Sequence, residues 1–224
     1  MTIYSAIENS IRTLFDEYFS DPTLYLRESN QQFRLNQLIL ENLIAETGKN
    51  TIDAKITPSI NGYANPDSKI KQSQTELKID YPGSPANSRS DIIVFKDQPI
   101  TLNREKNGPL DITAKILAND VAGVIELKSA PSANSSIPRG LVSDVEKLLD
   151  LVRSIPDKID AHFVNFDKSI GINGHSSSRK APVNWWSGQS FEVSNNKPKQ
   201  KYIIIWDIEA SAGNAPTIRK RFAY

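Results

Sequence analysis

Glu126 and Lys128, in the segment VIELK, have side chains that could act together in a reaction. The apolar and β-branched residues around them predict a buried strand, in which residues two positions apart share one face. Leu127 then packs on the opposite face. A carboxylate and an ammonium beside a buried run need partners or a purpose, because charged groups are costly to bury. The alternative is an ion pair on the solvated face of an ordinary strand.

Asp91 supplies a second carboxylate, because it begins the run DIIVF, which predicts another buried strand. If the two strands are neighbours, Asp91 meets Glu126. Two such carboxylates repel each other unless a divalent cation lies between them, and ligation by oxygen alone suits Mg²⁺, with Mn²⁺ as a substitute. A cation there could bind a scissile phosphate and activate a water molecule, with Lys128 beside it. Asp91 taken alone could instead cap a strand end.

These residues resemble the PD-(D/E)XK nuclease superfamily, and the resemblance spans roughly Ser29 to Val152. It implies that Asp91 and Glu126 bind the metal, that Leu127 lends its backbone carbonyl to it, and that Lys128 assists the attacking water. Many members carry a further acid on the first core helix, where Glu28 is our first choice and Glu41 the second. The sequence departs from the family in having Ser90 where the family has proline, and in the long separation of 35 positions between Asp91 and Glu126.

The resemblance implies an α/β fold with a restriction-endonuclease-like core, in which a central mixed β-sheet is flanked by α-helices. The implied activity is that of a Mg²⁺-dependent endodeoxyribonuclease leaving 5′-phosphate and 3′-hydroxyl ends, in a type II-like restriction enzyme or another defence nuclease. By analogy with enzymes that cut both DNA strands, we expect a homodimer. Two alternatives stay open: a catalytically idle nucleic-acid-binding or assembly protein on the same scaffold, and a nuclease for RNA or branched DNA.

A second stretch matches the written motif more literally, with Pro66-Asp67 followed by Glu76-Leu77-Lys78. Its neighbours, KIKQSQTELKID, are polar throughout. This predicts an edge or half-exposed strand whose Glu76 and Lys78 face water, so we favour the site at Asp91.

The remaining pattern predicts one domain over residues 1–224, with N-terminal helices in 1–48, a catalytic core in 70–166 and a C-terminal strand with DNA-contacting loops in 167–224. Apolar periodicity predicts helices over 2–19, 29–48 and 141–152, and strands over 75–80, 91–95, 121–128, 161–166 and 202–208. Residues 96–120 predict an irregular excursion with a short helix over 112–117.

The 224 residues carry a net charge of +1. The absence of cysteine excludes thiolate metal sites, and the presence of only two histidines argues against an imidazole cluster. No apolar run is long enough for a membrane span, and the start has no secretory leader, so we expect a cytoplasmic protein. We expect His162 to be a packed residue on a strand and His175 to make a minor contact from a loop. We expect Asp144 and Glu146 to be solvated charges on a helix.

Lys and Arg gather late in the chain and suggest where DNA is held. Arg179 and Lys180 stand close to Trp185 and Trp186, a combination that can grip phosphates and stack on bases. The alternative is that the tryptophans cover the core. We expect the cluster Arg219 to Arg221 to form either a tail that contacts phosphates or a tail that is simply solvated.

Overall fold

The computed structural model describes residues 2–21, 28–57, 68–82, 89–106, 112–130, 139–167, 186–209 and 216–224. Three helices and eleven strands are found there. The helices are α1 (Ile3–Ser20), α2 (Glu28–Thr47) and α3 (Arg139–Ser154). The strands are β1 (Thr51–Thr57), β2 (Ser68–Lys71), β3 (Ser73–Asp80), β4 (Ser90–Phe95), β5 (Ile100–Lys106), β6 (Ile112–Leu117), β7 (Val121–Ala130), β8 (Asp160–Asp167), β9 (Val193–Ser194), β10 (Ile203–Glu209) and β11 (Thr217–Ala223), with a short 3-10 turn at Ala118–Asp120.

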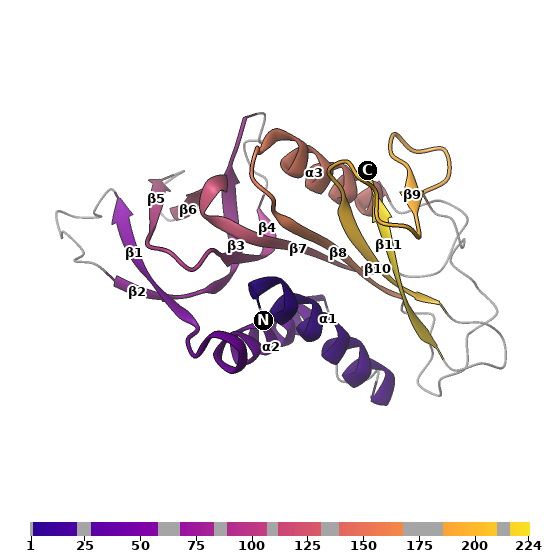
Figure 1. Ribbon diagram of the computed structural model, residues 1–224, viewed down its shortest axis with the longest axis horizontal. Coiled ribbons are helices and arrows are strands. Elements are labelled where there is room, and N and C mark those ends of the chain that lie inside the picture. The colour runs from indigo at the N-terminus through magenta and orange to yellow at the C-terminus, as the bar shows by residue number, and fades with distance from the viewer. Residues whose placement is uncertain are drawn as a thin grey trace.

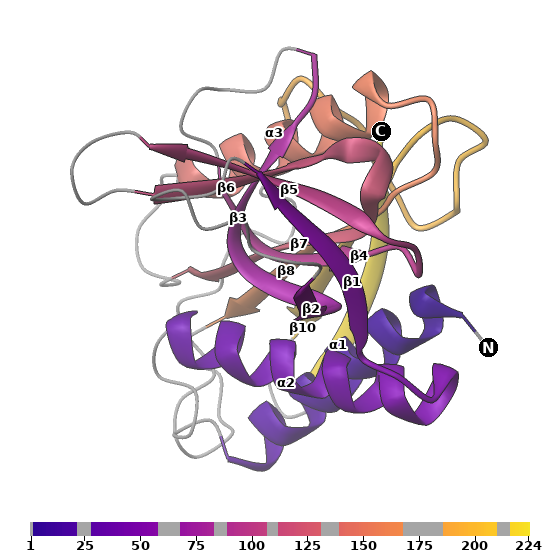
Figure 2. The same cartoon turned by 90° about the vertical axis from the view of Figure 1, so that its left-hand side faces the viewer.

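All the strands join one sheet in the order β2-β1-β5-β6-β3-β4-β7-β8-β10-β11-β9. Parallel and antiparallel neighbours both occur: β4 and β7 are antiparallel, whereas β8 is parallel to β7 and to β10. Helices α1 and α2 lie on one face of the sheet and α3 lies on the other (Figures 1 and 2). The expected α/β class, a mixed sheet flanked by helices, is confirmed.

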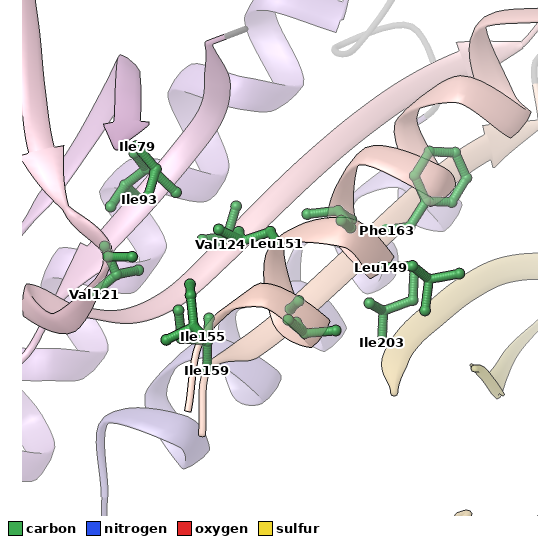
Figure 3. Close-up of a cluster of buried hydrophobic side chains, with 14 of the residues drawn as sticks. Ile79, Ile93, Val121, Val124, Leu149, Leu151, Ile155, Ile159, Phe163 and Ile203 are labelled. Atoms are coloured by element: carbon green, nitrogen blue, oxygen red, sulfur yellow. The ribbon is translucent and has the colours of Figure 1, made fainter. Parts of the chain in front are cut away.

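Two hydrophobic cores separate these layers. One lies between α3 and the sheet and includes Ile93, Val124, Leu149 and Phe163 (Figure 3). The other lies between α1, α2 and the opposite face, where Ile92 and its neighbours pack. Alternating residues of β4 and β7 therefore enter opposite cores, as expected for strands buried on both faces. The succession α2, β3, β4, β7, α3 is the one that the sequence led us to expect around the motif.

The helices predicted over 2–19, 29–48 and 141–152 are all present. Helix α2 ends before Gly48, whose φ of +77° and N–H bond to the Ile44 carbonyl provide the predicted C-terminal cap. No described helix is both long and apolar enough to cross a membrane.

The excursion before the motif was predicted wrongly. Residues 112–117 form strand β6, which pairs in antiparallel fashion with β5 and in parallel with β3. Ile116 is fully buried opposite Leu102, whereas the next residue, Leu117, is exposed. Successive side chains here point to opposite faces, as they do on a strand. The polar stretch 51–80 likewise contains three strands and not one, and β3 lies between β6 and β4, so it is no edge strand.

The basic cluster near the C-terminus is also part of the sheet, because Arg219, Lys220 and Arg221 all lie on β11. Arg221 is 6% exposed, and its Nη1 donates to Asp207 Oδ2 at 2.9 Å. Lys220 Nζ binds Glu8 Oε1 at 2.5 Å. The prediction that this cluster forms a tail is therefore wrong, because its three residues belong to a strand and carboxylates pair with Lys220 and Arg221.

Candidate active site

Asp91 and Glu126 take opposing positions on two central strands. Strand β4 pairs with β7 so that Ile92 faces Ile125, and the preceding and following residues, Asp91 and Glu126, come next in the same register. Residues opposed in this way have Cβ atoms about 4.5–5.5 Å apart and share a face. The long segment between the two motif halves is accommodated by β5 and β6, which leave the register of β4 and β7 intact.

Hydrogen bonds fix both the carboxylate and the backbone carbonyl of Asp91. Its Oδ2 accepts the Leu127 backbone N–H at 2.7 Å, and its backbone carbonyl accepts Nε2 of Gln32 on α2 at 2.7 Å. The N–H and C=O of one strand residue point to the same side of the strand. The Leu127 carbonyl therefore points toward β4, on the side where Asp91 lies.

Burial makes both acids reluctant to ionise. Glu126 is 3% exposed, and desolvation raises its pKa to about 8, against an opposing attraction from Lys147. Desolvation also raises the pKa of Asp91 to about 6, against the Leu127 hydrogen bond and the nearby Lys128. The Asp91 charge itself adds to the rise at Glu126. A bound cation would reverse these shifts by favouring the charged forms.

Lys128, near the end of β7, contacts an acid from each of the two helical layers. Its Nζ is 3.1 Å from Asp144 Oδ2 on α3 and 3.5 Å from Glu28 Oε1 at the start of α2. Burial works to lower the pKa of Lys128, but Asp144, Glu28 and Asp91 outweigh it and the net shift is upward. Lys128 is therefore a persistent cation and not a proton acceptor.

Of the two helix acids considered, only Glu28 is found at this cluster. Glu41 is mostly exposed and lies 3.6 Å from Arg34. Asp144 was wrongly predicted to be solvated: its side chain is 18% exposed and contacts Lys128. Glu146 is half-buried, and its Oε1 accepts a hydrogen bond from Ser190 Oγ at 2.6 Å near the surface.

Lys147 was missed by sequence reasoning. Its Nζ lies 2.6 Å from Glu126 Oε1 and donates to the Arg89 carbonyl at 2.6 Å. The available signal was helical spacing, because Asp144 and Lys147 are three residues apart on a helix and share a face. The spacing could not reveal that this face points at Glu126, since that depends on how α3 crosses the sheet.

The site has the donors that a hard divalent cation prefers, although no group of three or more His, Asp or Glu residues with metal-binding geometry occurs among the described residues. Mg²⁺ is commonly held by one or two carboxylates and keeps several waters. Asp91, Glu126 and a backbone carbonyl fit that requirement.

The literal second motif is not assembled in the described part of the chain. Glu76 is exposed and accepts Nε2 of Gln32 at 3.0 Å, while Lys78 is only 8% exposed, contrary to the expectation that both face water. Asp67 lies outside the described residues, so the rival site as a whole stays an untested alternative.

The predicted DNA-binding residues are only partly visible. Arg179, Lys180, Trp185 and also His175 lie outside the described residues. Trp186 packs partly against the core, and the Arg221 guanidinium lies 4.6 Å from its ring centre. An open cleft of about 570 Å³ is lined by Trp186, Arg219 and Arg221 among others.

His162 is fully buried, as predicted, with its Nε2 at 2.8 Å from Asp160 Oδ2 and its Nδ1 accepting a hydrogen bond from Trp206.

The sequence matches none of the protein families compared and no curated protein. The solved structures similar to the chain include two of NucC in a cAAA-bound form. NucC of P. aeruginosa ATCC27853 is 14% identical, with a TM-score of 0.33 over 74% of this chain and 62% of that one. NucC of E. coli MS115-1 is 12% identical, with a TM-score of 0.35 over 75% and 64%. The chain thus spans less than two thirds of either protein, and the α/β assignment rests on the elements described above.

Proposed function

We propose that this protein is a Mg²⁺-dependent endodeoxyribonuclease of the PD-(D/E)XK superfamily, acting as a type II-like restriction enzyme or another defence nuclease. One observation carries the proposal: the register of β4 and β7 opposes Asp91 to Glu126, with Lys128 on the same face two residues further along. An ordinary surface ion pair would not place the buried Glu126 beside the half-buried Asp91, with the pKa of both carboxyls raised.

Asp91, Glu126 and the Leu127 carbonyl would hold the Mg²⁺, and Mn²⁺ would substitute for it. When bound, the cation supplies charge neutralisation at the scissile phosphate and lowers the pKa of the attacking water. Asp91 is prepared for this role because the Leu127 N–H and Gln32 fix its carboxylate and its backbone.

Lys128 would stabilise the negative charge that grows on the phosphate and orient the attacking water. Its ammonium is aligned by Asp144 and Glu28, which also keep it protonated. Glu28 thereby acts on the reaction through Lys128. A pre-aligned cation of this kind contributes most when charge develops in a site that excludes water.

DNA is the proposed substrate and a homodimer the proposed assembly, with residues 1–224 forming one nuclease domain. Trp186 and the neighbouring Arg179, Lys180 and Trp185 are proposed to contact the DNA. The cleft beside Trp186 supports this, because Trp186 and Arg219 both line it, and aromatic rings stack on bases while arginines bind phosphates.

Plasmid cleavage with Mg²⁺ or chelator tests the proposal. We expect wild type to nick supercoiled DNA with Mg²⁺ only, and Asp91→Asn and Lys128→Met to be slower by about 10²-fold or more. Glu41→Gln, an acid away from the cluster, is the matched control and should cleave normally. DNA binding without cleavage under any metal would favour the idle binding protein, and preference for RNA or branched DNA would change the substrate.

A further inference from the structure

Lys147 makes a close contact with a residue that the proposed function assigns to the metal. Its Nζ is 2.6 Å from Glu126 Oε1, in a contact that joins α3 to the centre of the sheet. The Glu126 side chain is 4% exposed and that of Lys147 is 19% exposed. The ammonium thus lies against the carboxylate largely out of water, where a unit charge needs a partner.

The other ammonium of the cluster is engaged elsewhere. Lys128 contacts Asp144 and Glu28, at 3.1 and 3.5 Å, so the carboxylates divide between the two lysines. Lys147 attracts Glu126 mainly through its charge, with a smaller contribution from a hydrogen bond. A divalent cation would attract the same carboxylate, so the ammonium and the divalent cation compete for it.

Lys147 also has a second anchor. Its Nζ donates to the Arg89 carbonyl at 2.6 Å, two residues before Asp91. A lysine is a compact charge on a flexible four-carbon stem, so it can move away from one partner while keeping another. The second anchor would retain Lys147 near the site after it leaves Glu126.

We infer that Lys147 is an internal counter-ion, which neutralises Glu126 while no divalent cation is bound and competes with that cation for the carboxylate. The inference rests on the proposed function and deepens it. Lys147 is in this sense a positioning residue: it holds the carboxylate in the metal-free enzyme and sets the cation concentration at which the site fills.

Metal binding by the Lys147→Met variant tests the inference without measuring cleavage. By titration calorimetry we expect Mn²⁺ to bind Lys147→Met about tenfold more tightly than wild type, because the competing cation is gone. In chelator the variant should unfold at a lower temperature, and Mn²⁺ should raise its Tm more than that of wild type. Lys147→Arg keeps the charge and should bind Mn²⁺ no more tightly than wild type.

Lys96→Met is the matched control, because Lys96 forms an ion pair with Asp157 at a distance of 2.9 Å on the surface. Its Mn²⁺ affinity should equal that of wild type. If Lys147→Met does not fold, nitrogen-15 spectra of the lysine ammonium groups in wild type give the answer. The Lys147 signal, identified by its loss in Lys147→Arg, should shift on adding Mg²⁺, and an unchanged signal at saturating Mg²⁺ overturns the inference.

The outcomes separate the two proposals. If wild type cleaves DNA and Lys147→Met binds Mn²⁺ as tightly as wild type or more weakly, the role of Lys147 is overturned and the nuclease proposal stands. If wild type binds no Mn²⁺ and Lys147→Met does, the counter-ion role is supported and the metal-dependent nuclease is overturned. If neither protein binds Mn²⁺, both proposals fail.

Discussion

At the scale of residues, the protein keeps one buried acid, Glu126, beside a half-buried one, Asp91, before any cation is bound. Glu126 and Asp91 are paired with an ammonium and a backbone N–H, yet desolvation still dominates and raises the pKa of each. This arrangement lowers the stability of the metal-free protein. Cation binding restores that stability, because ligands that bind the folded state stabilise it. The cost is open to direct measurement.

Glu126→Gln measures it through the pH dependence of unfolding in chelator. A carboxyl whose pKa is higher in the folded than in the unfolded state contributes stability that is fully present below the unfolded value, here near 4.5, and is lost as the pH rises through about 8. The unfolding free energy of wild type should therefore fall relative to that of Glu126→Gln between pH 5 and pH 9, by about 1 kcal/mol or more.

Urea unfolding at a series of pH values gives this comparison. Glu41→Gln, at an exposed carboxyl, is the control and should track wild type over the same range. A constant difference between wild type and Glu126→Gln from pH 5 to pH 9 would show that burial does not raise the pKa of Glu126.

At the scale of elements, the site depends on how neighbouring segments fix β4 and β7. Glu76 lies on β3 where the register with β4 passes from Thr75 and Ile92 to Leu77 and Ser90. Its φ is +59°, in the left-handed region, and Gln32 bonds both its carboxylate and the Asp91 carbonyl. Glu76, whose backbone is strained, and Asp91, a proposed metal ligand, are thus both bound to helix α2 through Gln32.

Comparing Glu76→Gly with Glu76→Ala isolates the strain, because both lose the carboxylate and only glycine adopts positive φ freely. We expect the glycine variant to be more stable by about 1 kcal/mol. Asp80, exposed at the end of the same strand, is the control, and there alanine should be the more stable choice. Thermal unfolding decides, and an alanine variant at position 76 as stable as the glycine variant would contradict the strain.

Gly123 lets α1 approach β7 closely. A Cβ at this position would collide with Ile7 Cδ1 on the fully buried face of α1. Gly123→Ala should therefore destabilise the protein by about 1–3 kcal/mol. Ile7→Val removes the colliding atom, so Gly123→Ala should cost less in that background. Chemical denaturation of all four proteins tests this double-mutant cycle, and additive effects would argue against the close approach.

At the scale of the whole molecule, stability and chemistry are located in different parts of one sheet. Asp91 and Glu126 lie on central strands, with four strands beyond β7 and five beyond β4. On β8, β10 and β11, Asp207 accepts from Asn165 Nδ2 at 3.1 Å and from Arg221 at 2.9 Å. This buried network ties three strands together and includes none of Asp91, Glu126 and Lys128.

Arg221→Met should destabilise the protein by about 3–5 kcal/mol, because it leaves the Asp207 carboxylate buried without its counter-charge. Lys220→Met on the same strand breaks a half-exposed pair with Glu8 and should cost no more than about 1 kcal/mol. Urea unfolding measures both. Mn²⁺ affinity should stay at the wild-type value in the folded Arg221→Met protein, and an altered affinity would mean that the network reaches the site.

The sequence by itself determined the three helices, the buried strands at Asp91 and Glu126, and the shared face of Glu126 and Lys128. These follow from local periodicity, which a chain carries in its own order of apolar residues. Strands β1, β2, β5 and β11 were missed because many of their residues are polar or charged and form strands only by pairing with neighbours. Strand β6 was mistaken for a helix, because its short apolar segment is compatible with either structure. Partnerships across layers depend on packing: Lys147 with Glu126, Asp144 and Glu28 with Lys128, and Gln32 with Asp91. Only the tertiary structure decided these contacts, because the positions of helices on a sheet are fixed by the cores between them and not by spacing along the chain.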